Sequence, residues 1–468
     1  MQLSGPTTRR AAPPTAGHPP ARPVSLRWTQ LPRPHLKAAK VSQFQAGLPG
    51  GRLSVSAAST SSDPTPTAPP AVPSPKASSS SSSSAFVGGK EDGSPPRPHT
   101  VIYPDSVRSS IQDAWQSLVR WSRMRNRGNN SRSNSVQKIA VLGGGSFGTA
   151  LASTLAARDP TMDVVLLMRD KKTCDDINNL HINTKYLKEY TLPTNVRATL
   201  NAEEALSGVQ YALHAVPCQH SRKFLKNIKH LVPPGLPIIC VSKGLELGTG
   251  DTMAKIISSV HGPKQPTCFL SGPSFAKEVM EKRPFSLVAA SKDPKLCAKV
   301  QDLMAGEFVR VNSTNDVVGV EICGALKNVL AIAAGIVEGM DLGRNAQAAV
   351  IVQGCAEIRW LAESMGASPT TISGLSGLGD IMLTCYGDLS RNRSVGLRLG
   401  RGESLADILA SSSQVAEGVA TAGVVVTVAR QYRVQLPVLT AVAQVLGNEL
   451  GPREAVDEIM QLPQVAER

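Results

Sequence analysis

The sequence contains no C-x-x-C pair. Its eight cysteines occur singly between Cys174 and Cys385. Zinc sites are commonly built from closely spaced cysteine or histidine pairs, and small disulfide-stabilised proteins carry a dense cysteine framework. Because neither pattern occurs, we expect no metal site, and we expect free thiols as in a reducing compartment.

Long apolar runs without charge are also missing. The most apolar stretch, Val317 to Met340, contains Glu321 and Lys327. Charged residues are rare within helices that cross a membrane, so we expect no transmembrane span. No internal repeat is visible, which argues against solenoid and propeller folds.

Acidic residues are almost absent from residues 1–90, which contain Asp63 alone against ten arginines and lysines. The same stretch is rich in serine, proline and alanine and includes an unbroken serine run from Ser78 to Ser84. Such a composition cannot build a core and is typical of an organelle transit peptide. Its length and its proline and serine content favour a plastid over a mitochondrion, so we expect the mature protein in the chloroplast stroma.

The basic charge of the chain lies mostly in this leader and the segment after it. Residues 1–137 carry +12 of the total net charge of +14, which leaves the rest nearly neutral. A removable basic leader therefore explains the high pI better than nucleic-acid binding does, and we expect no nucleic-acid partner.

The linker, residues 91–137, contains an expected helix from Ser106 to Arg127. Ile111, Trp115 and Leu118 share one face of it, among several arginines. A basic amphipathic helix can lie on a membrane surface, or it can be a docking helix or part of a linker. Peripheral membrane contact stays open at this stage, and residues 128–135 are expected to form a flexible joint.

One stretch has the pattern of a dinucleotide site. After the apolar run at 138–142, Gly143, Gly145 and Gly148 follow the spacing G-x-G-x-x-G and lead into a helix-compatible segment. The first glycine permits a tight turn, the second lets backbone approach a pyrophosphate, and the third allows close packing of helix on strand. N–H groups at the start of the helix would bind the phosphates. A glycine turn without a ligand is the alternative.

Strand and helix patterns alternate from residue 138 to about residue 315. This alternation indicates right-handed crossovers and an α/β Rossmann domain, with a mostly parallel, doubly wound sheet and helices on both faces. The expected strands are 138–142, 163–168, near Val196, 211–216, 237–242, 267–270, 286–290 and 307–311; the expected helices are 149–157, 202–206, 220–231 and 251–260, and residues 169–190 are expected to be irregular.

Strand patterns fade beyond residue 316, and the second domain is expected to be all-α. Its first two helices are apolar nearly all round, so we expect both to be central. The expected helices are 317–340, 346–365, 404–409, 418–431, 436–446 and 453–460. The domains are therefore expected at 1–90, 91–137, 138–315 and 316–468.

Several polar residues stand where ligands would bind. In a parallel sheet this is the carboxyl edge of the strands, where Lys243 and the turn at 271–276 are expected, together with Pro217. In the helical half, Lys327 is a lone lysine in an apolar helix, and burial would lower its pKa toward that of an acid–base catalyst. Arg391 and Arg393 lie in a polar stretch, expected to be a loop, that could hold an anion. Structural turns, a snorkelling lysine and a solvated loop are the alternatives.

Seven motifs occur in the order and approximate spacing of one family. They are GxGxxGTA, HAVPCQ, SKGLE, SGPSFA, ALKNVLAIAAG, GLGD, and SRNRS followed by VAEG, and they span residues 138–460. In these motifs the chain resembles the NAD(P)-dependent glycerol-3-phosphate dehydrogenases, and its leader resembles that of the plant-type plastidial members. The resemblance implies hydride transfer between a nicotinamide and the pair glycerone phosphate and sn-glycerol 3-phosphate, without metal and in support of glycerolipid synthesis. It also implies a homodimer.

The resemblance assigns roles to individual positions. Lys327 resembles the proton-transfer lysine, accompanied by Lys243 and Asp380 as the catalytic set. The substrate set implied is Lys243, Gly272, Ser274, Asn328, Thr384, Ser390, Arg391 and Asn392, with Arg391 on the phosphate. The cofactor set implied is Gly143, Gly145, Ser146, Phe147, Gly148, Arg169, Lys243, Ala276, Arg391 and Glu417.

Cofactor choice depends on the residues that end the second strand. An acidic residue there favours NAD, whereas an arginine accepts the 2′-phosphate of NADP. Arg169 and Asp170 supply both. We expect NADP and NAD both to be used, with a modest preference for NADP(H). Two other functions stay open: another β-hydroxyacid-type dehydrogenase of the same architecture, and a non-catalytic nucleotide-sensing or lipid-associating protein.

Overall fold

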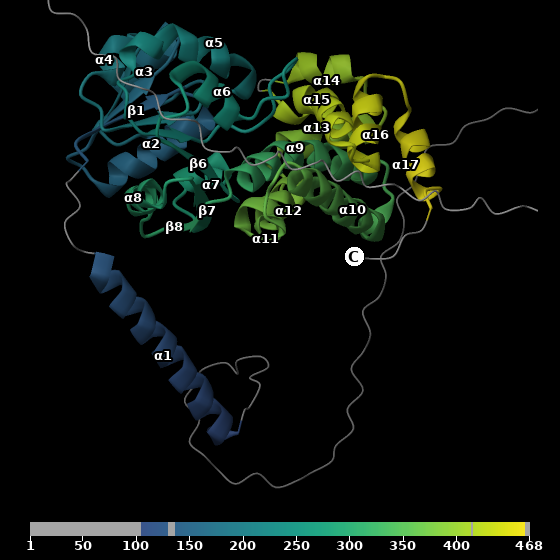
Figure 1. Ribbon diagram of the computed structural model, residues 1–468, viewed down its shortest axis with the longest axis horizontal. Helices are drawn as coiled ribbons and strands as arrows, with labels where there is room; N and C mark the ends of the chain where they lie inside the picture. Colours follow the sequence, from purple (N-terminus) through teal and green to yellow (C-terminus); the bar gives the residue numbers. More distant parts are fainter. Residues whose placement is uncertain (1–103, 130–135, 413–414, 464–468) are drawn as a thin grey trace, which may run out of the picture. The chain divides into compact units, whose positions relative to one another are not determined.

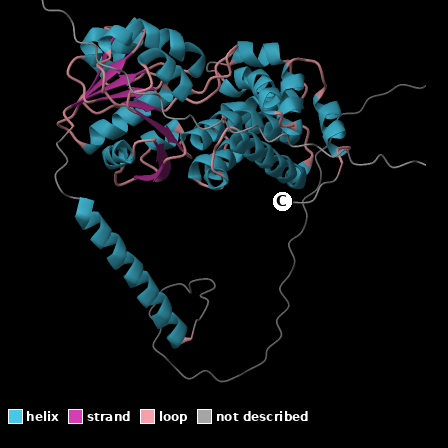
Figure 2. Ribbon diagram, viewed as in Figure 1, coloured by secondary structure: helices cyan, strands magenta, loops and turns pink. Residues whose placement is uncertain are grey.

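A computed structural model describes residues 104–129, 136–412 and 415–463 of the chain. The expected transit peptide lies outside these residues, and so does most of the expected joint at 128–135. The first described element is helix α1 (Asp105–Asn129), which confirms the helix expected over residues 106–127. Strands gather in the N-terminal part of the remaining chain, and the C-terminal part is helical (Figure 1, Figure 2).

An eight-stranded sheet has the order β3-β2-β1-β4-β5-β6-β7-β8. All neighbouring strands are parallel except β6 and β7, which are antiparallel. The first six strands follow the order of the doubly wound dinucleotide fold, which confirms the expected Rossmann architecture. The strands are β1 (Lys138–Leu142), β2 (Asp163–Leu167), β3 (Val196–Thr199), β4 (Tyr211–His214), β5 (Ile238–Cys240), β6 (Thr267–Ser271), β7 (Phe285–Ala290) and β8 (Val309–Thr314).

Helices cover both faces of this sheet. In β1, Ile139 and Val141 belong to one hydrophobic cluster, whereas Ala140 and Leu142 belong to another on the opposite face. Burial on both faces explains why the strands are continuous apolar runs rather than alternating ones. The helices of this part are α2 (Ser146–Arg158), α3 (Lys171–Leu180), α4 (Ala202–Leu206), α5 (Cys218–Ile228), η1 (Lys229–Leu231), α6 (Met253–His261), α7 (Ala276–Met280) and α8 (Pro294–Met304).

Two of these helices correct the sequence analysis. Residues 169–190 were expected to be irregular, but α3 occupies half of them, and α8 lies where no helix was expected. Asp170 starts α3 by accepting a hydrogen bond from the N–H of Thr173, and Asp293 starts α8 in the same way at Lys295. The polar composition of α3 obscured its pattern, because only three of its residues are buried.

The C-terminal part is built around α9 (Val317–Gly339). It packs against α10, α12, α13, α15 and α16. Among the described residues α9 alone is long and apolar enough to cross a membrane, and 94% of its apolar window is buried inside the protein. The other helices are α10 (Gly343–Ser364), α11 (Pro369–Ile372), the π-helical turn η2 (Leu375–Gly379), α12 (Asp380–Tyr386), α13 (Arg391–Gly400), α14 (Leu405–Ser411), α15 (Glu417–Tyr432), α16 (Pro437–Leu446) and α17 (Pro452–Met460).

α10 is less central than expected. Val352 is 64% exposed and Trp360 is 37% exposed, so one apolar face of this helix reaches the surface of the chain. The apolar sequence of α10 gave no sign of this, because composition alone does not separate a buried apolar face from an exposed one.

The stretch expected to be a polar loop is helical. Ser390 is the N-cap of α13, and Arg391 is its first residue. Glycines allow this helix to pack closely on α9: a Cβ at Gly396 would lie 2.0 Å from the carbonyl oxygen of Ile332, and one at Gly335 would lie 2.1 Å from that of Arg393. These glycines let the backbones of α9 and α13 approach each other.

Candidate active site

Two lysines from different parts of the fold share one carboxylate. Lys243 follows β5, and its Nζ lies 2.8 Å from Oδ2 of Asp380. Lys327 lies on α9, and its Nζ lies 2.6 Å from Oδ1 of the same residue. Asp380 is the first residue of α12 and is 1% exposed. The three residues of the expected catalytic set therefore lie together where the sheet meets the helical part.

Burial changes the proton affinity of Lys327. It lowers the pKa of this lysine to about 8, and the neighbouring Asp380 opposes the shift. Nζ also donates a hydrogen bond to Thr384 Oγ1 at 2.9 Å, and the Thr384 hydroxyl donates in turn to the carbonyl oxygen of Asp380 at 2.5 Å. A lysine with this pKa can either donate or accept a proton near neutral pH.

Asp380 holds the two cations in place. Burial raises the pKa of its carboxyl, but Lys243 and Lys327 together outweigh burial, so the pKa lies below its usual value. The ionised carboxylate therefore compensates two ammonium groups that would otherwise repel each other. Ser271, at the end of β6, adds a longer contact of 3.5 Å from its Oγ to Oδ2. Sequence reasoning missed Ser271, although it begins the turn that was singled out.

The glycine-rich turn after β1 has the geometry expected of a pyrophosphate site. Gly143 has a φ of +115°, and a Cβ at Gly148 would lie 2.3 Å from the carbonyl oxygen of Gly143. A Cβ at Gly145 would meet nothing within 4 Å. α2 begins directly after Gly145 with no side-chain cap. Its first N–H groups, including those of Ser146 and Phe147, can therefore donate hydrogen bonds to phosphate oxygens.

A cleft of about 680 Å³ joins this turn to the helical part. Ser146 lines it on one side, Ala276 at the start of α7 lines it further along, and Ser390 and Arg391 line it from α13. Arg391 is exposed. Glu417, the first residue of α15, lies close to the same cations: burial raises the pKa of its carboxyl, and Arg391, Lys243 and Lys327 offset part of that shift.

In the polar segment around Arg391, some side chains already bond to other residues of the protein, whereas that of Arg391 is exposed in the cleft. Arg393 binds Glu338 through two hydrogen bonds, of 2.7 Å from Nε and 2.6 Å from a terminal nitrogen, and it also binds Asp388 at 2.9 Å. The expectation that Arg393 helps to hold an anion is therefore wrong in this structure, because its guanidinium is already paired. The Ser390 hydroxyl accepts the N–H of Arg393 as a helix cap.

Asn328 and Asn392, both expected near substrate, contact each other. Asn392 Nδ2 donates to Asn328 Oδ1 at 3.0 Å, and Asn392 Oδ1 accepts the N–H of Gly418 at 2.9 Å. This chain of bonds connects α9, α13 and α15. It ties together three helices that carry candidate site residues.

The remaining candidates lie in the turns of the sheet. Gly272 has a φ of +148°, and a Cβ there would lie 2.6 Å from the carbonyl oxygen of Ser286, while the Ser274 hydroxyl donates to the carbonyl of Gly272. Arg169 is exposed after β2. The Asp170 side chain caps α3 by accepting a hydrogen bond from the N–H of Thr173. Pro217, expected at a third strand end, is the N-cap of α5.

Comparison with known proteins identifies the family. Family models described as the N-terminus and the C-terminus of NAD-dependent glycerol-3-phosphate dehydrogenase match residues 138–297 and 316–457. A chloroplastic NAD(+) glycerol-3-phosphate dehydrogenase of Oryza sativa subsp. japonica is 57% identical over 76% of this chain and 82% of its own length. An NAD(P)+ glycerol-3-phosphate dehydrogenase of Oleidesulfovibrio alaskensis is 44% identical over 69% of this chain and 98% of its own.

A solved structure agrees with these matches. The crystal structure of glycerol-3-phosphate dehydrogenase from Coxiella burnetii superimposes with a TM-score of 0.67 at 33% identity, covering 70% of this chain and 99% of that one. The uncovered part of this chain corresponds in size to the residues before position 138, where the family match begins. The sequence matches, the shared fold and the order of the motifs agree: this chain belongs to the NAD-dependent glycerol-3-phosphate dehydrogenase family.

Proposed function

We propose that this protein reduces glycerone phosphate to sn-glycerol 3-phosphate with NADH or NADPH, and catalyses the reverse reaction, in the plastid stroma. The observation that carries the proposal is the shared carboxylate: Lys243 and Lys327 both bind Asp380. The carboxylate thereby favours the protonated form of Lys327 despite the burial of this lysine. Family membership supports this function over another β-hydroxyacid-type dehydrogenase and over a non-catalytic sensor.

Each group has a distinct task in the proposed reaction. When bound, the nicotinamide supplies or takes the hydride. Lys327 donates a proton to the ketone oxygen as negative charge develops there, and in the reverse direction neutral Lys327 removes the alcohol proton. Lys243 adds a second positive charge near that oxygen. Arg391 faces the cleft and is suited to bind the dianionic phosphate of the substrate.

The dinucleotide fits the residues around the glycine turn. Gly143, Gly145 and Gly148, with the N–H groups of Ser146 and Phe147, would hold the pyrophosphate. Ala276 and Glu417 would lie near the nicotinamide end, and Arg169 near the adenosine end. Thr384, Asn328, Asn392, Ser390, Gly272 and Ser274 would complete the substrate site.

A comparison of two ketones tests the proposal. Purified residues 136–468 should oxidise NADH or NADPH, measured at 340 nm, much faster with glycerone phosphate than with unphosphorylated dihydroxyacetone. The matched control is the Arg391→Ala variant, in which the difference between the ketones should shrink. Equal rates with both ketones in the wild type would contradict the phosphate-binding role, and no oxidation with either would contradict the function.

We also propose a homodimer and the domain division 1–90, 91–137, 138–315 and 316–468. The apolar face of α10, with Val352 and Trp360 exposed, is suited to burial against a second copy. Light scattering of the purified protein measures the mass, and Val352→Asp should favour the monomer. A wild-type monomer at micromolar concentration would contradict the dimer.

We also propose peripheral membrane contact, which rests on α1. Its residues Val107, Ile111, Trp115 and Leu118 are exposed and spaced for one helix face. Co-sedimentation of the full chain with phosphatidylglycerol vesicles should be reduced by Trp115→Asp. Equal sedimentation of wild type and variant would contradict a role for α1.

A further inference from the structure

Helix α6 begins without the cap that its sequence would provide. Thr252 is the N-cap residue, and threonine often accepts a hydrogen bond from the first turn of its own helix. Here the Thr252 side chain makes no such bond. Instead, Glu321 of α9 accepts the N–H of Ala254 in that first turn, at 2.8 Å. The acceptor for a helix of the sheet part thus comes from the helical part.

The environment of Glu321 is unfavourable for a charged carboxylate. Burial raises the pKa of its carboxyl to about 7, although the N–H of Ala254 and the hydroxyl of Thr252 favour the charged form. Lys255 on α6 also favours it. No part of the proposed reaction uses Glu321, so the presence of a half-buried carboxyl here calls for another explanation.

The segment between α6 and the active-site lysine is held as one unit. The N–H of Glu246 donates to the carbonyl of Asp251 at 3.0 Å, and that of Gly250 donates to the carbonyl of Glu246 at 2.9 Å. The Glu246 carboxylate binds Arg222 at 2.7 Å. These hydrogen bonds hold residues 246–251 as a closed loop. A displacement of the start of α6 would therefore also displace Lys243, which lies three residues before this loop.

α9 presents three residues in succession to the sheet part. Glu321, Gly324 and Lys327 are spaced by three, so they lie on one face of the helix. A Cβ at Gly324 would lie 3.3 Å from the Ser271 hydroxyl and 3.5 Å from the Lys243 side chain. The side chain of Lys243 therefore runs close to α9, one turn from Glu321.

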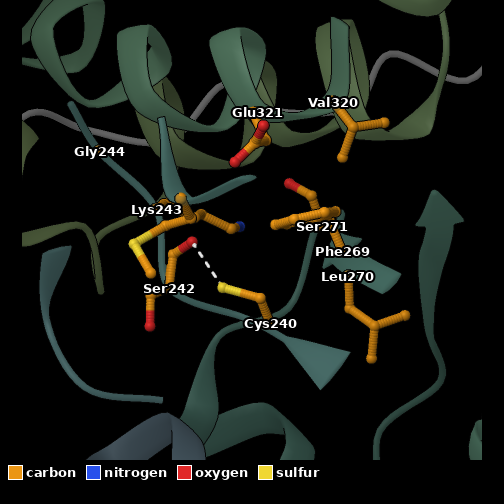
Figure 3. A pocket seen from close by; sticks show the side chains of 10 residues that line it. Cys240, Ser242, Lys243, Gly244, Phe269, Leu270, Ser271, Val320 and Glu321 are labelled. Carbon is orange, nitrogen blue, oxygen red and sulfur yellow. Dashed lines mark hydrogen bonds between the residues drawn. The ribbon is translucent and has the colours of Figure 1, made fainter. Parts of the chain in front are cut away.

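A small cavity lies at this contact. It has room for about one water molecule, with a volume of 10 Å³, and Lys243, Ser271 and Glu321 line it together. In Figure 3 the Glu321 carboxylate reaches in from α9, while the Lys243 amine and the Ser271 hydroxyl reach in from the ends of β5 and β6. At this contact polar side chains from the two parts of the fold lie beside an apolar cluster in which Val320 of α9 joins Met253 and Phe269.

We propose that Glu321 is a positioning residue: by capping α6 from α9, it sets the distance between Lys243 and Lys327 so that both reach Asp380. Gly324 is the second requirement, because it lets the Lys243 side chain lie against α9. This inference rests on the proposed function. Glu321 does not touch the reacting atoms and acts through the lysine that follows β5.

Three variants test this inference by comparing turnover with stability. Glu321→Leu should lower kcat with glycerone phosphate at least about tenfold, with little change in KM for the dinucleotide, because misplacement of a catalytic group slows the chemical step. Glu321→Gln should keep at least about half of the wild-type kcat, since its amide oxygen can still accept the N–H of Ala254. Gly324→Ala should lower kcat several-fold while the melting temperature holds or rises, because alanine favours a helix more than glycine.

Glu357 provides a matched control. It also caps another helix from a distance, accepting the N–H groups of Val438 and Leu439 at 2.9 and 3.1 Å, but it joins two helices of the helical part. Glu357→Leu should lower the melting temperature and leave kcat unchanged at a temperature where the variant is folded.

The outcomes separate the inference from the proposed function. Wild-type kcat in both Glu321→Leu and Gly324→Ala would overturn the positioning role, and so would a loss of kcat in Glu321→Leu no greater than in Glu357→Leu. If Glu321→Leu does not fold, Glu321→Gln and Gly324→Ala still decide the matter. An inactive wild type would instead contradict the proposed function.

Discussion

The Nζ atom of Lys327 lies 2.6 Å from Oδ1 of Asp380, in a site where burial lowers the pKa of the lysine to about 8. The carboxylate therefore preserves a positive charge that the surrounding apolar helix disfavours. Without it, desolvation would act on Lys327 unopposed, and the lysine would lose its proton at lower pH. This pair determines how the proposed reaction should depend on pH.

The two reaction directions should respond to pH with opposite sign. Ketone reduction needs protonated Lys327, so kcat for reduction should fall as pH rises through about 8. Alcohol oxidation needs neutral Lys327, so kcat for oxidation should rise through the same range. Turnover measured from pH 6 to 10 in both directions checks this, and profiles that change in the same sense in both directions would contradict the role.

Removal of the Lys327 amine should abolish most of the activity. Lys327→Met should lower kcat by at least about 100-fold, the scale of losing an acid–base group, and should leave NADH binding largely intact. Enhancement of NADH fluorescence measures the binding. Lys299→Met on α8, where the lysine is exposed, is the matched control. A Lys327→Met variant that keeps more than about a tenth of the rate would assign the proton to another group.

Alanine substitutions of Arg391 and Arg393 should affect different properties, namely substrate binding at Arg391 and stability at Arg393. Arg391→Ala should raise KM for glycerone phosphate by at least about 100-fold with little change in melting temperature, because its guanidinium faces the cleft. Arg393→Ala should lower the free energy of unfolding by about 2 kcal/mol, because it removes two short hydrogen bonds from Glu338 and leaves this carboxylate only longer contacts with Arg344 and Gln347. Urea unfolding and steady-state kinetics on both variants measure the contrast. Similar effects in the two would contradict the division.

Arg169 should influence the choice between cofactors. Asp170 is engaged in capping α3 through Thr173, which leaves Arg169 as the candidate for the 2′-phosphate of NADP. We expect kcat/KM to favour NADPH by about tenfold, or ~1.4 kcal/mol, and Arg169→Ala to remove that preference. Equal losses with NADH and NADPH would indicate that Arg169 stacks on the adenine, and a wild-type preference for NADH would reverse the expectation.

The leader should direct the protein to plastids. A fluorescent fusion of residues 1–90, with a single acidic residue, should enter them, because the composition is that of a transit peptide. A fusion of residues 136–468 is the control and should stay outside. Import of the leader fusion into mitochondria would contradict the localisation.

Periodicity predicted most of the fold, and its failures have physical causes. The β1 strand and α9 were predicted to within one residue, because burial on all sides leaves a continuous apolar run. α3 was missed because most of its residues are polar and only three of them are buried. The start of α13 was expected to be a loop because residues 384–393 are polar and glycine-containing, whereas in the structure Ser390 caps a helix that begins at Arg391.

The sequence allowed residues of the candidate site to be predicted, but not the partners to which they are hydrogen-bonded. Lys327 was identifiable as a lone charge in an apolar helix. No sequence pattern revealed that Arg393 is held by Glu338, or that Glu321 caps α6. These partners are separated by many residues, and only the fold brings them together.

The charges on α9 have a further consequence before the protein is folded. By length and composition this helix could cross a membrane, so an unfolded chain would expose an apolar segment of membrane-spanning length. A lysine or acid near the middle of such a segment opposes partitioning into lipid by about 2.5–3.5 kcal/mol. Lys327, the proposed proton-transfer residue of the folded protein, should therefore also bias the unfolded chain toward the aqueous phase.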